Sequence, residues 1–263
     1  PIIYAGVLAF GFILLSVARE LLERNVFMLW VLVLYGIILL ELFITANHFH
    51  IEHRKNTNKK YELERNGFIQ YSHHILLPTL LYFGLSFLLY FFSNPNLYFL
   101  VIVGSFVLFM ILYENIHAFY KHTYALYKST NYIYDLVSII LVYLWTAVIL
   151  QFIHDINAST ITEIIVLGVF YSLVVGLSFL RHSFDRSNIY VLLSFIIVIS
   201  WFVQIMDFYS FSPESISLIS TFSFAMLIGY ENNALDGTNK IAAVLEYLII
   251  ILLIFSLITL YGI

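Results

Sequence analysis

The sequence predicts an all-α protein, a bundle of about nine transmembrane helices that forms one integral membrane domain over residues 1–263. Two observations predict this class. Of the 263 residues, 62% are hydrophobic and only 11% are charged, whereas soluble domains carry about 25% charged residues. The apolar residues also occur in long runs of Leu, Ile, Val and Phe without the alternation of a barrel strand, and only helices and closed barrels satisfy their backbone hydrogen bonds in lipid.

Nine apolar segments have about the length of 20 residues that a helix needs to cross about 30 Å of hydrocarbon. Short turn-forming stretches separate several of them, such as the residues around Pro95, those from Asp155 to Ser159, and those around Pro213. The predicted segments are Ile2–Ala18, Val26–Asn47, Ile69–Phe92, Leu97–Tyr120, Tyr132–His154, Thr160–Leu180, Ile189–Phe208, Pro213–Tyr230 and Ile241–Tyr261.

The basic residues predict the orientation of this bundle. Ten of the twelve Lys and Arg residues follow even-numbered segments, and only Arg19 and Arg24 fall on the opposite face. Loops rich in Lys and Arg remain on the cytoplasmic side of a membrane. We therefore expect the N-terminus inside and the C-terminus outside, in a bacterial or archaeal plasma membrane or an organellar inner membrane.

Several classes of function find no support in the sequence. The chain contains no cysteine, which excludes disulfides and thiolate chemistry. No large cluster of Lys and Arg favours nucleic acid as a partner. The sequence also has no HExxH metalloprotease helix, no GxGD pair and no Gly-rich phosphate loop. These absences leave open whether the protein is an enzyme at all.

Polar residues gather on the predicted cytoplasmic face, where eight of the nine histidines fall. Ionisable groups within a membrane are costly, and they usually line a cavity or pair with one another. We therefore expect a polar cavity that opens to the cytoplasm, although a single histidine can also rest at the level of the lipid head groups. Acids and amides on this face include Glu41, Asn47, Glu114, Asn115, Asp135, Asp185, Glu231 and Glu246.

Histidine side chains on this face also raise the possibility of a metal site. Imidazole groups suit zinc, iron and copper, so a divalent metal is one possible cofactor. The spacing of these histidines does not reproduce the histidine boxes of membrane desaturases, because no HxxHH motif is present. The candidate ligands are His48, His50, His53, His117 and His182.

Three stretches on the same face form a further pattern: NHFHIEHRKNTNKK from Asn47, YALYKSTNYIYD from Tyr124, and RHSFDR from Arg181. Together with the nine-helix topology, they resemble the UbiA-type intramembrane prenyltransferase superfamily. This resemblance implies a cavity that faces the cytoplasm and takes a prenyl or other lipid ligand. It implies contacts to the ligand's head group from Asn47, Lys128, Asp135, Asp185 and Arg186.

The chain departs from this family where the family binds metal. Two aspartate clusters hold Mg²⁺ against a prenyl diphosphate in the family, since hard oxygen ligands suit that ion. Here the first stretch has histidines and no aspartate, and the second cluster retains only Asp185. We therefore expect a divergent member that has lost or changed its diphosphate chemistry.

Three functions remain compatible with the sequence. The first is a lipid- or prenyl-handling protein whose partners are membrane lipids, with Lys128 and Arg186 supplying positive charge to an anionic head group. The second is a non-catalytic structural subunit whose partners are other membrane subunits. The third is a metal-dependent membrane enzyme or transporter with histidine ligands, which requires at least three imidazoles within reach of one ion.

Overall fold

The structure is a computed structural model, and it describes the backbone of residues 2–21, 24–56, 63–92, 95–120, 124–181, 196–206 and 211–235. It describes side chains over residues 2–19, 26–44, 75–92, 96, 98–116, 133–176, 196–206 and 211–229. Throughout these ranges the chain is helical apart from short connections, and they contain no strand. The predicted all-α class is therefore confirmed for the described part of the chain.

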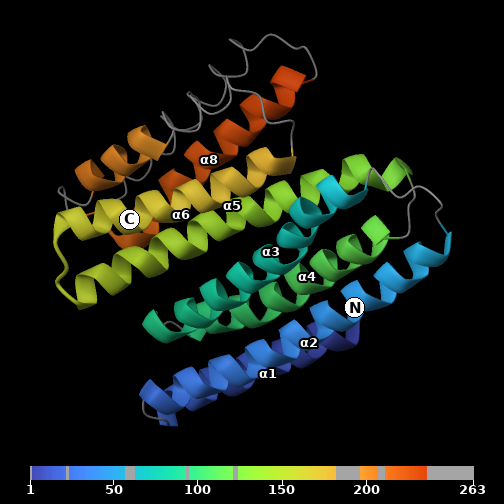
Figure 1. Ribbon diagram of the computed structural model, residues 1–263. Helices are drawn as coiled ribbons and strands as arrows, with labels where there is room; N and C mark the ends of the chain where they lie inside the picture. Colours follow the sequence, from blue (N-terminus) through green and yellow to red (C-terminus); the bar gives the residue numbers. More distant parts are fainter. Residues whose placement is uncertain are drawn as a thin grey trace. The chain divides into compact units, whose positions relative to one another are not determined.

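Seven helices have defined bounds, and an eighth helical stretch covers Ile196–Met206 (Figure 1). The last predicted segment, Ile241–Tyr261, lies outside the described residues, so the number of nine helices remains a prediction. The helices are α1 (Ile2–Leu21), α2 (Arg24–Asn56), α3 (Leu63–Phe91), α4 (Pro95–Tyr120), α5 (Tyr124–Asp155), α6 (Thr160–Arg181) and α8 (Pro213–Leu235).

The turn residues explain where several helices begin. The Ser159 hydroxyl accepts a hydrogen bond from the backbone N–H of Thr162 at 3.4 Å, and Ser212 does the same for Ser215 at 3.3 Å. These are N-cap bonds that satisfy a free N–H group in the first turn of α6 and of α8. Between α5 and α6, Asn157 has a φ of 50°, in the left-handed region that asparagine tolerates better than most residues.

The second helix is longer than its apolar segment. Its apolar span is Val26–Ile44, but the helix continues to Asn56 through the polar stretch that contains the first three candidate histidines. The sequence pattern predicted an end at Asn47 instead. Hydrophobicity measures only the part of a helix that lipid can surround, and no Gly or Pro interrupts the chain between Asn47 and Asn56.

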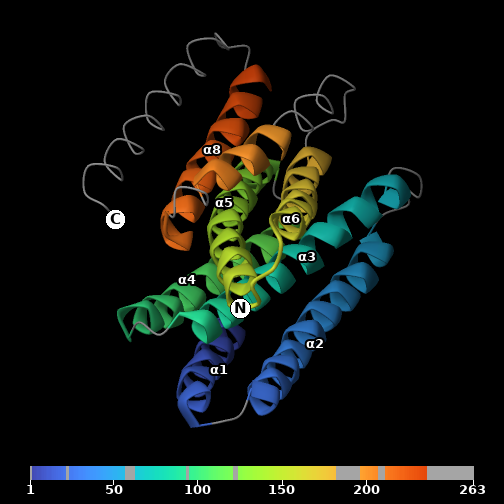
Figure 2. The same ribbon diagram turned by 90° about the vertical axis from the view of Figure 1, so that its left-hand side faces the viewer.

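The chain divides into two compact units, residues 1–137 and residues 138–263, and the boundary falls within α5. In the first unit, α1 packs most extensively against α4 and also contacts α2 and α3 (Figure 1, Figure 2). Contacts of α3 with α2 and α4 complete this four-helix group. The prediction of a single integral membrane domain is not tested by this division, because both units are helical and apolar.

Arg19 links three helices of the first unit. Its guanidinium donates one hydrogen bond to the Phe92 carbonyl oxygen at 2.8 Å and another to the Tyr98 hydroxyl, and it lies 5.7 Å from the centre of the Tyr98 ring. The last carbonyl groups of a helix have no partner within the helix. Arg19 therefore provides a hydrogen-bond donor for a free carbonyl group at the end of α3. This gives a structural role to one of the two basic residues on the predicted outer face.

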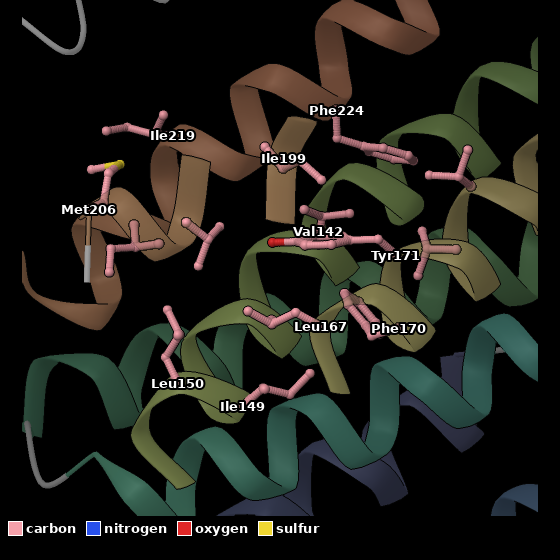
Figure 3. Packing of buried hydrophobic residues seen from close by; sticks show 14 of the residues in the cluster. Val142, Ile149, Leu150, Leu167, Phe170, Tyr171, Ile199, Met206, Ile219 and Phe224 are labelled. Atoms are coloured by element: carbon pink, nitrogen blue, oxygen red, sulfur yellow. The ribbon is translucent and has the colours of Figure 1, made fainter. Parts of the chain in front are cut away.

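The core of the second unit is a cluster of large apolar side chains from α5, α6, α8 and the Ile196–Met206 stretch (Figure 3). Val142, Leu167, Ile199 and Phe224 represent these four elements. One polar contact lies inside the cluster, where the Tyr171 hydroxyl meets the Thr146 hydroxyl at 2.9 Å. Such hydrogen bonds between helices stabilise membrane bundles, typically by about 0.6 kcal/mol each.

Four described helices contain spans that are long and apolar enough to cross a membrane, as an integral membrane protein requires: Ile2–Arg19, Val26–Ile44, Tyr98–Ile116 and Ile133–Asp155. The surface supports the same conclusion. Phe43 and Phe99 are each 70% exposed, and Trp201 is 68% exposed. Large side chains of this kind on the outside of a helix bundle suit a surface that faces lipid. The orientation of the helices and the identity of the membrane remain predictions.

Candidate functional site

Four buried polar side chains lie at one end of the first unit. Glu41, Asn115 and Asp135 are each 4% exposed, and Tyr113 is 2% exposed. Consecutive helices of this unit run in opposite directions (Figure 1), so the end of α2, the end of α4 and the start of α5 lie towards the same end. We call these four residues the buried polar layer.

Three residues of the buried polar layer belong to apolar helices. Glu41 lies in the span Val26–Ile44, Tyr113 in Tyr98–Ile116 and Asp135 in Ile133–Asp155. Buried polar groups in such spans are costly unless something contacts them.

Electrostatic interaction reaches the Tyr113 hydroxyl from two other helices. Its sources are the Glu41 carboxyl group on α2 and the Tyr4 hydroxyl on α1. Both α2 and α4 contact α1 in this unit. The interaction acts through space, and Tyr113 forms no hydrogen bond with either group in the described protein.

The Tyr113 hydroxyl makes no hydrogen bond within the described part of the protein, although it is buried. Its ring packs beside Phe109, with 6.0 Å between the ring centres. Burying a hydroxyl without a partner costs about 1–3 kcal/mol. A carboxylate accepts hydrogen bonds, and a phenol both donates and accepts them. The Tyr113 hydroxyl can therefore form a hydrogen bond with a polar group that reaches it.

The five predicted ligand residues are only partly described. Asp135 is buried on α5 as part of the buried polar layer. Asn47 belongs to α2 and Lys128 to α5, but the side chains of both lie outside the described residues. Asp185 and Arg186 lie outside the described residues altogether. Whether these five side chains converge remains a prediction.

The predicted metal ligands are likewise only partly described. The backbones of His48, His50 and His53 belong to α2 and that of His117 to α4, while their side chains and all of His182 lie outside the described residues. Among the side chains that are described, no group of three or more His, Asp or Glu residues could hold a metal ion. The metal hypothesis therefore remains a prediction.

Two buried residues did not stand out in the sequence. Tyr113 is one of 20 tyrosines, and the sequence gives no signal that its hydroxyl is buried beside an acid. Glu163 is 3% exposed in the first turn of α6. The sequence could have indicated a structural role for Glu163, because it follows the Ser159 cap. A carboxylate in the first turn of a helix is stabilised by the positive end of the helix dipole.

Comparison with known proteins adds no relative: no family model, no curated protein and no solved structure matches the chain. The resemblance to UbiA-type prenyltransferases therefore rests on the three sequence stretches and the predicted topology alone. Evidence about function comes instead from the chemistry of the buried polar layer and from the apolar spans around it.

Proposed function

We propose that this protein binds a membrane lipid, with the polar head of the lipid at the buried polar layer and its tail along the apolar helices. In this role it is a divergent, UbiA-like lipid- or prenyl-handling protein. The observation that carries the proposal is the Tyr113 hydroxyl, which is buried and has no hydrogen-bond partner in the described protein.

Within the described part of the protein, the Tyr113 hydroxyl is buried at a cost. An apolar side chain in its place would avoid burying a hydroxyl group without a partner. A bound head group that accepts a hydrogen bond from Tyr113 would remove this cost. The resemblance also implies a contact from Lys128, which belongs to the first unit and whose side chain lies outside the described residues.

A structural role in a larger membrane complex is a second candidate, and the surfaces of α1 and α2 favour it. Only 28% of the residues in each of their spans are buried, compared with 61% in the span Ile133–Asp155. The residues of these spans that the first unit does not bury can face either lipid or another subunit. On this alternative, a partner helix would cover part of α1 and α2.

The two candidates differ in what purifies with the chain. The full chain is purified in mild detergent, its bound lipids are extracted and identified by mass spectrometry, and its assembly state is read from a native gel. Lipid binding predicts one lipid class that is enriched over the bulk membrane and bound in stoichiometric amount. A chain that carries no enriched lipid and migrates only within a larger complex would support the structural role instead. Metal analysis of the same sample tests the histidine hypothesis.

A further inference from the structure

We infer that α3 has a hinge at Pro78. Its first arm, residues 63–77, bends about this hinge, while its second arm, residues 79–91, stays fixed to α2. The inference concerns a movement of the first unit and does not depend on the proposed function. Three features carry it: the break in the backbone hydrogen bonds at the proline, the contacts that hold the second arm, and the polar character of the first arm.

Pro78 interrupts the backbone hydrogen bonds of α3. It lies in the interior of the helix Leu63–Phe91 and is buried. A proline has no backbone N–H group, and its ring crowds the carbonyl group four residues earlier, which here belongs to His74. Proline is one of the few causes of sharp bends in helices. The helix is therefore easiest to bend where its two arms meet.

Two hydrogen bonds hold the second arm to α2, and both lie directly after the proline. The hydroxyl groups of Thr79 and Tyr35 are 3.2 Å apart. The Tyr82 hydroxyl donates a bond of 2.7 Å to the Val31 carbonyl oxygen, and the rings of Tyr35 and Tyr82 stack with 6.0 Å between their centres. These contacts begin one residue after Pro78, so they fix the second arm up to the hinge itself.

Packing strengthens the hold on the second arm. Leu81, Leu85, Leu88 and Leu89 are each at most 4% exposed, and van der Waals packing of this kind drives the association of membrane helices. Displacing the second arm would therefore break many contacts at once.

The first arm differs in composition. The apolar stretch of α3 begins only at Ile75, so residues 63–74 of the first arm precede it. These residues read LERNGFIQYSHH, and a polar segment of this kind can move in water without carrying its polar groups into lipid. The first arm follows the end of α2 in the chain, so it lies towards the same end of the first unit as the buried polar layer. Bending at Pro78 would therefore change access to that end of the unit.

The test measures the distance from α2 to each arm with pairs of spin labels. The chain contains no cysteine, so labels attach only where one is introduced. Leu32→Cys, on the exposed side of α2, is the shared reference. It is paired with Asn66→Cys in the first arm or with Phe91→Cys in the second, which lie twelve and thirteen residues from Pro78 and are matched in lever length. Double electron–electron resonance is recorded on the purified full chain in lipid nanodiscs.

A change in bend of about 20°, the size of a sharp kink, at the end of an arm of about 18 Å moves a label by about 6 Å. We expect the distances of the first pair to spread over about 6 Å more than those of the second pair. Pro78→Ala restores the missing N–H group and should narrow the first distribution to the width of the second, without changing the second. Thermal unfolding shows that each variant is folded.

Two results would overturn the inference. One is an equal width for the two pairs in the original chain, a comparison that needs no substitution at Pro78. The other is an unchanged width of the first pair in folded Pro78→Ala, because the spread would then arise elsewhere in the first arm.

Discussion

Two buried tyrosines of the first unit differ in what their hydroxyl groups contact. Tyr82 on α3 is 1% exposed and donates a hydrogen bond of 2.7 Å to the carbonyl oxygen of Val31 on α2. Tyr113 is buried to a similar extent, but its hydroxyl has no such partner in the described protein. Two residues of one type therefore have opposite effects: one hydroxyl stabilises the fold, and the other is retained at a cost.

Replacing each tyrosine by phenylalanine tests this difference. Tyr82→Phe should lower the free energy of unfolding by about 1 kcal/mol, since it removes one buried hydrogen bond. Tyr113→Phe should leave stability unchanged or raise it, because no bond is lost. The measurement is thermal unfolding of delipidated protein in detergent. A loss of stability in Tyr113→Phe as large as that in Tyr82→Phe would mean that the fold itself satisfies the Tyr113 hydroxyl.

At the scale of helices, Gly11 marks a close approach between α1 and α2. A Cβ atom added to Gly11 would lie 2.9 Å from Cδ2 of Leu34, whereas one added to Gly6 on the same helix would meet nothing within 4 Å. Small residues allow membrane helices to approach closely. The two glycines of α1 therefore differ in their packing role, although the sequence around both is equally apolar.

Gly11→Val should destabilise the first unit by about 1–3 kcal/mol, because the Leu34 side chain must move to make room for the added methyl groups. Gly6→Val makes the same chemical change in open space and should be close to neutral. Thermal unfolding of the two variants in the same detergent gives the comparison. Equal stability of the two would mean that Leu34 turns away at little cost and that this contact does not fix the helix pair.

The helices also show how far sequence reasoning extends at this scale. Apolar runs predicted the membrane-facing parts of α1, α4 and α6 closely, and the starts of α6 and α8 followed from the turn residues that precede them. The polar extension of α2 to Asn56 was not predicted. Hydrophobicity predicts only the part of a helix that lipid can surround. The helix itself is held by backbone hydrogen bonds, and these can continue into a polar segment.

For the whole molecule, the distribution of Lys and Arg predicts which ends of the helices face the cytoplasm. The chain has no cysteine, so one introduced cysteine can be labelled without background. Ile156 lies in the exposed turn between α5 and α6, and Asn56 is the last residue of α2. The predicted orientation places these two positions on opposite sides of the membrane.

In intact cells, a membrane-impermeant maleimide should label Ile156→Cys and should label Asn56→Cys only after the membrane is opened. The physical reason is that loops rich in Lys and Arg are retained on the cytoplasmic side. Full labelling after detergent treatment is the control that both cysteines are accessible. The reverse pattern would invert the topology, and labelling of both from outside would contradict the alternation of the helices.

The sequence alone determined the helical class and the apolar spans, because both depend on composition and on local runs of residues. It also predicted that one end of the bundle is the polar end, which stays a prediction, while Glu41, Asn115 and Asp135 are buried in the first unit. Only the tertiary structure decided that Tyr113 is buried and that its hydroxyl has no partner in the described protein. Which side of a helix is buried depends on how α4 is rotated where it packs against α1 and α3, and no local pattern in the sequence specifies that rotation.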